Sequence, residues 1–197
     1  MKTLNESDFL RWADQNELGL DERYPQSAVL HFRPNPELAR FWEVPLEPER
    51  RPYFIASMLE LMGDWQACYV WRNLGSWPQV VEGSRINDVV EWRILKGLGL
   101  PLGTTDVVEL SRNETDTLVT LMFSTTIFGW SVGEDLYVVP NHARHVLKVS
   151  HHDVIHAHFR FEEDLERYVK GMDAREFALP ESVRDRTFKQ PSWMKEP

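Results

Sequence analysis

The sequence has a single cysteine, Cys68, so no disulfide bond can form within the chain. It has no apolar run long enough for a transmembrane helix, because the longest uncharged stretch, Thr117 to Gly133, falls short of the about 20 residues that a span needs. Residues 1–8 are polar and contain no apolar signal core. We therefore expect a cytoplasmic protein without a membrane partner.

Basic residues are scarce relative to acidic ones. The 197 residues include 22 Lys and Arg against 31 Asp and Glu, which gives a formal net charge of -9. Binding to nucleic acid depends on a basic surface, so we expect no nucleic-acid partner. An acidic surface instead favours solubility and contact with a basic partner.

Motifs of nucleotide and structural metal sites are also missing. The sequence contains no P-loop, no G-x-G-x-x-G, no C-x-x-C, no EF-hand loop and no H-E-x-x-H. We recognise no family in it. Hydrophobic residues make up 42% and charged residues 27% of the chain, as in ordinary globular proteins.

The pattern of apolar residues predicts an α+β fold. The tryptophan-rich first half, residues 1–97, is expected to be mainly helical, and from residue 104 the apolar period of two predicts an antiparallel β-meander closed by a helix. The expected helices cover residues 7–16, 48–62, 84–96 and 162–170, and the expected strands cover residues 27–32, 65–72, 107–111, 117–125, 136–139, 146–150 and 154–159. We assign residues 1–171 to one domain, in which residues 1–97 are mainly helical and residues 98–171 are mainly sheet, and residues 172–197 to an irregular surface tail.

Histidines are concentrated in a short segment. Six of the seven lie between residues 142 and 158, at positions 142, 145, 151, 152, 156 and 158. Imidazole clusters bind zinc and other divalent transition metals, and alternation along a strand puts His156 and His158 on the face away from the core. With His145 and Asp153 they are candidate metal ligands. The interpretation that we favour is that these histidines are solvent-facing strand and turn residues, with no bound cofactor.

A second candidate site is the sequence Gly129-Trp130-Ser131-Val132-Gly133, which matches the G-x-S-x-G nucleophile elbow. Ser131, Asp153 and His156 follow one another in the order of a catalytic triad. The elbow requires a helix after the serine, whereas a strand-like run follows Gly133. We therefore expect a glycine-rich hairpin connection here, and we assign no catalytic residue.

Aromatic residues alternate along one expected strand. Trp65, Tyr69 and Trp71 share a side and can form a stacking platform for a ligand or partner, or the core face of the strand. We favour the core face. Cys68 lies on the opposite side and is expected to be a small buried hydrophobic residue.

These observations favour a non-enzymatic binding or interaction module with an acidic surface. Its expected partner is another protein or a second copy of the chain. The alternative is a small metal-dependent or serine hydrolase centred on the histidine-rich hairpin, residues 142–158.

Overall fold

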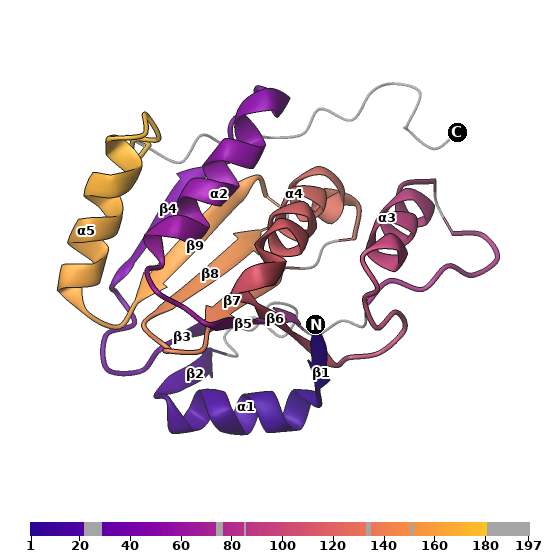
Figure 1. Ribbon diagram of the computed structural model, residues 1–197, viewed down its shortest axis with the longest axis horizontal. Coiled ribbons are helices and arrows are strands. Elements are labelled where there is room, and N and C mark those ends of the chain that lie inside the picture. Colours follow the sequence, from indigo (N-terminus) through magenta and orange to yellow (C-terminus); the bar gives the residue numbers. More distant parts are fainter. Residues whose placement is uncertain (22–28, 74–76, 85, 133–134, 151, 181–197) are drawn as a thin grey trace.

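The computed structural model describes residues 1–21, 29–73, 77–84, 86–132, 135–150 and 152–180, with Asp21 and residues 129–132 described by their backbone alone. Figure 1 shows the arrangement of its helices and strands. The helices are α1 (Glu6–Gln15), α2 (Arg51–Leu61), α3 (Ile86–Gly97), α4 (Thr115–Val132) and α5 (Glu162–Asp173), with short 3-10 turns at Pro48–Arg50 and Arg112–Glu114. The strands are β1 (Lys2–Leu4), β2 (Leu18–Asp21), β3 (Val29–Phe32), β4 (Ala39–Glu43), β5 (Ala67–Arg72), β6 (Val107–Ser111), β7 (Leu136–Pro140), β8 (His145–Ser150) and β9 (Val154–Phe159). The α+β class is confirmed.

One antiparallel sheet of seven strands organises the molecule. Its strand order is β1-β6-β5-β7-β8-β9-β4, and β2 and β3 form a separate two-stranded hairpin. Of the expected meander only β7-β8-β9 is observed, followed by α5, because β5 lies between β6 and β7. The N-terminal half is less helical than expected, because it also contains the strands β1, β2 and β4, which the sequence did not predict. Strand β4 lies at the edge of the sheet beside β9.

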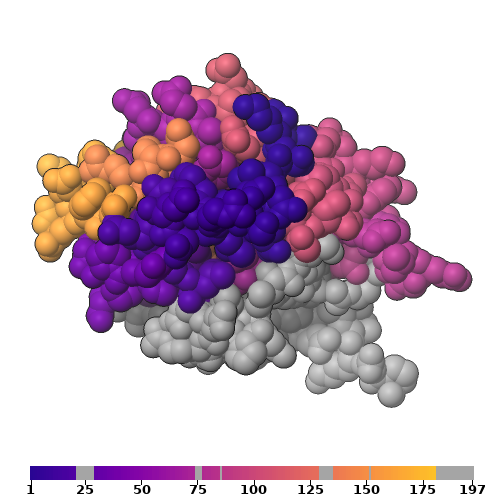
Figure 2. All heavy atoms as spheres, turned by 90° about the horizontal axis from the view of Figure 1, so that it is seen from below, coloured from indigo at the N-terminus to yellow at the C-terminus, as the bar shows by residue number. Residues whose placement is uncertain are grey.

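Layers of different kinds cover the two faces of the sheet. Helices α2, α4 and α5 bury one face, where alternate residues of the central strands, such as Val70, Val138 and Leu147, meet the helices in the larger core. Helix α1 and the β2-β3 hairpin bury the other face in a smaller core around Phe9 and Trp71. Figure 1 shows α1 and the hairpin on one side of the sheet, and Figure 2 shows the N-terminal residues, in indigo, spread over that side.

The expected strand at residues 117–125 is wrong, because these residues lie within α4. The buried side chains of Leu118, Leu121, Met122 and Thr125 recur at helical spacing. The hydroxyl of Thr125 donates to the carbonyl of Leu121 at 3.0 Å, so the helix satisfies its buried polar group internally. No helix in the described part of the chain combines the length and the apolar character needed to cross a membrane.

Helix α5 ends later than expected and continues through Asp173. Its packing against α2 depends on Gly171, since a Cβ atom there would lie 2.4 Å from Cδ2 of Leu61. Beyond the helix, Phe177 packs edge-on against Phe54 with ring centroids 5.2 Å apart. This contact fixes the first residues of the expected tail on α2, and residues 181–197 lie outside the described residues.

Candidate functional site

The sheet separates the histidines that the sequence grouped as metal ligands. His145 is paired with Phe159 across β8 and β9 and faces the helices, whereas His156 and His158 face the other side. Asp153 lies in the turn between the two strands, with a positive φ of 59°. The described residues contain no group of three His, Cys, Asp or Glu side chains placed to hold a metal ion. His145 therefore cannot share a metal ion with His156 and His158.

His145 is completely buried, contrary to the expectation of a solvent-facing residue. Its ring lies within about 6 Å, centroid to centroid, of the rings of His142, Phe159 and Tyr168. Neither ring nitrogen has a hydrogen-bond partner among the described residues. Burial lowers the pKa of His145 to about 3, so the imidazole is neutral at physiological pH.

His156 and His158 share one face, as expected, but they do not form an open chelating pair. Their ring centroids are 6.5 Å apart, and His158 is only 8% exposed. Burial lowers the pKa of His158 to about 3 and that of His156 to about 4. The next cause is the neighbouring ring of His156 for His158 and the positive charge of Lys148 for His156. Lys148 forms a 2.8 Å ion pair with Asp135.

The remaining histidines have separate roles. His142 accepts a hydrogen bond from the backbone N–H of Arg144 at its Nδ1 and donates from Nε2 to the carbonyl of Met62, 3.1 Å away. It thus joins the β7-β8 turn to the end of α2. His152 is exposed, and His151 lies outside the described residues.

Ser131 lies in the last turn of α4, so the expectation of a hairpin connection at this point is wrong. Strand β7 follows the helix, which is the reverse of the strand-serine-helix order that a nucleophile elbow requires. Gly133 lies outside the described residues, and only the backbone of Ser131 is described. Asp153 lies in the turn before β9, and His156 lies within β9.

The aromatic stripe of β5 is divided between the two cores. Trp65 precedes the strand and lies in the larger core, where its indole N–H donates to the carbonyl of Leu59. Trp71 lies in the smaller core, and its indole N–H donates to Glu6 at 2.7 Å. Both are at most 2% exposed, and Tyr69 is half-buried against Trp12. They therefore do not form one open platform, whereas Cys68 is buried as expected.

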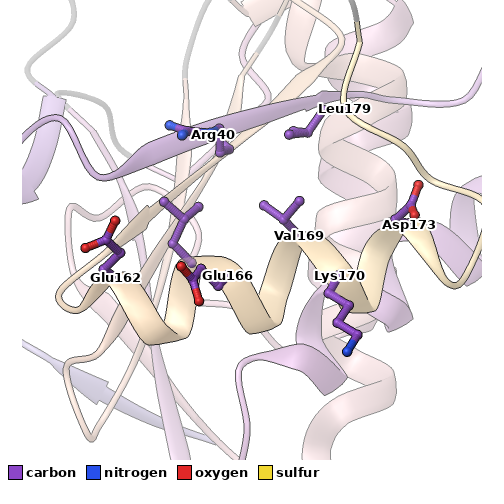
Figure 3. A pocket seen from close by; sticks show the side chains of 8 residues that line it. Arg40, Glu162, Glu166, Val169, Lys170, Asp173 and Leu179 are labelled. Carbon is purple, nitrogen blue, oxygen red and sulfur yellow. The ribbon is translucent and has the colours of Figure 1, made fainter.

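A groove that the sequence did not indicate runs between α5 and the edge strand β4. It has a volume of about 670 Å³, within the range of protein ligand pockets. Its apolar lining is Leu165, Val169 and Leu179, and Arg40 stands on the β4 side. Figure 3 shows Val169 directed from α5 toward Arg40 and Leu179.

Acidic side chains dominate the α5 side of this groove. Glu162, Glu166 and Asp173 line it and are exposed, and within the described part of the chain none of them forms an ion pair. Lys170 also lines the groove, but Figure 3 shows its side chain directed away from β4. The lining, as the structure describes it, combines apolar, acidic and basic side chains and contains no histidine, cysteine or serine.

On the opposite side of α5 the carboxylates form ion pairs. Glu163 pairs with Arg144 at 2.9 Å, and the buried Asp164 pairs with both Arg144 and Arg167 at 2.8 Å. Two adjacent glutamates of one helical turn, Glu162 and Glu163, therefore differ: among the residues that the structure describes, Glu163 has a cationic partner and Glu162 has none.

Helical spacing in the sequence places Glu162, Glu166 and Val169 on one side of a helix. This spacing could have indicated the α5 side of the groove. Arg40 and Leu179 come from remote parts of the chain, so the groove itself required the fold.

Comparison of the chain with protein-family models, with curated proteins and with solved structures finds no match. The geometry of the chain itself is therefore the basis for a functional conclusion.

Proposed function

We propose that this protein is a non-enzymatic interaction module that binds a protein partner through the groove between α5 and β4. The observation that carries the proposal is the combination, in one concave surface, of apolar side chains with carboxylates that have no cationic partner among the described residues. Apolar contacts in a groove supply affinity, and charges around them supply orientation and specificity.

The other candidate positions support the proposal indirectly. His145 and His158 are buried in the sheet layers, and Trp65 and Trp71 fill the two cores. Their positions account for these residues as structural components. The groove carboxylates, in contrast, form no ion pair within the described residues and lie beside Val169 and Leu179, which the core covers only in part. For the metal-dependent hydrolase alternative, the described part of the chain contains no group of three His, Cys, Asp or Glu side chains placed to hold a metal ion.

The proposal can be tested by replacing one groove residue and one matched surface residue. Val169→Gln puts a polar amide in the groove, and Tyr53→Gln makes a comparable change on the exposed side of α2, where Tyr53 is 74% exposed. A partner recovered in stoichiometric amount by the wild type should be retained by Tyr53→Gln and lost by Val169→Gln. Once identified by mass spectrometry, it should bind the purified protein with the same pattern. Equal binding by both variants would contradict the groove as the binding surface.

A second copy of the chain is the other protein that can occupy the groove. Light scattering distinguishes this case, because self-association through the groove raises the molecular mass with concentration in the wild type and not in Val169→Gln. If light scattering gives the mass of a monomer at all concentrations, a second copy is excluded and the occupant is a different protein.

A further inference from the structure

We infer that the occupant of the α5-β4 groove is a short basic segment of a partner protein, with cationic side chains on both sides of an apolar one. This inference rests on the proposed function and specifies the chemistry of the partner. It follows from the order of charges along the groove, from their spacing and from the contrast between the two sides of α5.

Along the groove, apolar side chains lie between two carboxylates. Glu162 lies in the first turn of α5 and Asp173 at its last residue, and both line the groove. Leu165 and Val169 lie between them, and Figure 3 shows the two carboxylates near opposite ends of the helix. A complementary ligand thus has a cation, an apolar side chain and a second cation in that order.

The distance between the two carboxylates at the ends of α5 sets the spacing of the cations in the ligand. The 11 residue steps from Glu162 to Asp173 correspond to about 16 Å along the helix axis. An extended peptide advances about 3.3 Å per residue, so cations about five residues apart reach both carboxylates. The wall formed by β4 also suits an extended ligand, because β4 is the edge strand and pairs with β9 on one side.

Two cationic side chains of the protein itself, Arg40 and Lys170, already line the groove. Arg40 donates to the carbonyl of its neighbour Ala39 at 2.7 Å and, within the described residues, forms no ion pair with α5. Lys170 likewise has no ion pair there. Within the described residues, the carboxylates of Glu162, Glu166 and Asp173 therefore have no ionic partner, although Arg40 and Lys170 line the same groove.

The test uses a synthetic hexapeptide with blocked ends, arginine at both terminal positions, leucine in the middle and serine elsewhere. Two control peptides replace the arginines by glutamate or the leucine by serine. Titration into isotopically labelled protein at low salt, followed by amide chemical shifts, should give saturable shifts on α5 and β4 with the basic peptide. Both controls should bind several-fold more weakly.

Matched variants in one helical turn test the role of the carboxylates. Glu162→Gln should weaken binding of the basic peptide about threefold at low salt, as expected for loss of one exposed ion pair. Glu163→Gln removes the same charge at the adjacent position and should leave the dissociation constant nearly unchanged, because Glu163 is held by Arg144.

The outcomes separate this inference from the proposed function. Equal binding of the basic and acidic peptides in the groove would overturn the inference and leave the groove as a binding surface. Absence of shifts on α5 and β4, or equal effects of Glu162→Gln and Glu163→Gln, would also overturn it. Loss of a natural partner in Val169→Gln, measured independently, would still support the proposed function in those cases.

Discussion

The histidine-bearing hairpin β8-β9 and the α5-β4 groove contrast in composition and in exposure. The hairpin holds the most unusual composition of the sequence, yet His145 is fully buried and His158 is 8% exposed. The groove is lined by common residue types, yet Glu162 and Glu166 are exposed there without ion partners in the described part of the chain. The histidines His145 and His158 therefore belong to the interior, whereas the glutamates of the groove are accessible to solvent.

This difference shows why composition is a weak guide to function. A histidine can act on a ligand when its ring nitrogens are accessible, whereas the neutral rings of His145 and His158 pack as polar members of a core. A carboxylate that the fold does not neutralise remains available for binding. The contrast predicts that changes in the hairpin alter stability and that changes in the groove alter binding.

The largest expected effect is loss of stability in acid. The folded-state pKa values of His145 and His158, about 3, lie below the ordinary 6.5, so the unfolded chain binds more protons between these values. The contribution of each ring is present above pH 6.5 and is lost as the pH falls toward 3. Between pH 7 and pH 5 each ring should lower the free energy of unfolding by about 2 kcal/mol, so the two rings together should lower it by about 4 kcal/mol. Urea unfolding at several pH values measures this loss.

Replacing the two rings provides the control for that measurement. His145→Leu and His158→Leu should each flatten the pH dependence, with little loss of stability at pH 7, because each removes ring nitrogens that have no hydrogen-bond partner in the described structure. A wild-type free energy of unfolding that does not change between pH 7 and pH 5 would contradict the neutral, buried state of these rings.

A second effect separates the two sides of α5. Asp164 is fully buried and paired with Arg144 and Arg167, so Asp164→Asn should lower the free energy of unfolding by about 3 kcal/mol. Glu166→Gln, on the groove side of the same helix, should change it by less than about 0.5 kcal/mol. Chemical denaturation of both variants checks this, and equal costs would show that the groove carboxylates also support the fold.

The smallest effect distinguishes adjacent glutamates. Glu162→Gln and Glu163→Gln lose the same interaction with the N-terminus of α5, but Glu163→Gln also loses the ion pair with Arg144. Glu163→Gln should therefore be less stable than Glu162→Gln by up to about 0.5 kcal/mol at low salt. Thermal unfolding of the two variants side by side measures the difference, and a less stable Glu162→Gln would reverse the assignment.

The sequence predicted those elements in which one period dominates. Strands β6 and β9 have the expected ends, and the apolar spacing predicts α5, although Gly171 lies within the helix and does not end it. Helix α4 was missed because its β-branched residues favour a strand locally, whereas Leu118, Leu121 and Met122 pack as a helical stripe in the larger core. Long-range packing decided this segment.

Alternation along a strand predicted which histidines share a face and could not predict what covers that face. Packing around β8 and β9 buries His158, and the helices bury His145, so the expected exposure was wrong for both. The groove was missed for the same reason, because Arg40 and Leu179 meet α5 only after the sheet has formed.

The most direct test of the account is photo-cross-linking from the two contrasted regions. A benzophenone amino acid at Arg40, in the exposed β4 wall, should give one discrete adduct with a partner protein in an extract of the source cells, whereas the same group at the exposed His152 should give none. The linked peptide should carry lysine or arginine on both sides of an apolar residue, and the purified partner should reproduce the adduct. An adduct from position 152 and none from position 40 would place the binding surface on the histidine hairpin and contradict the account.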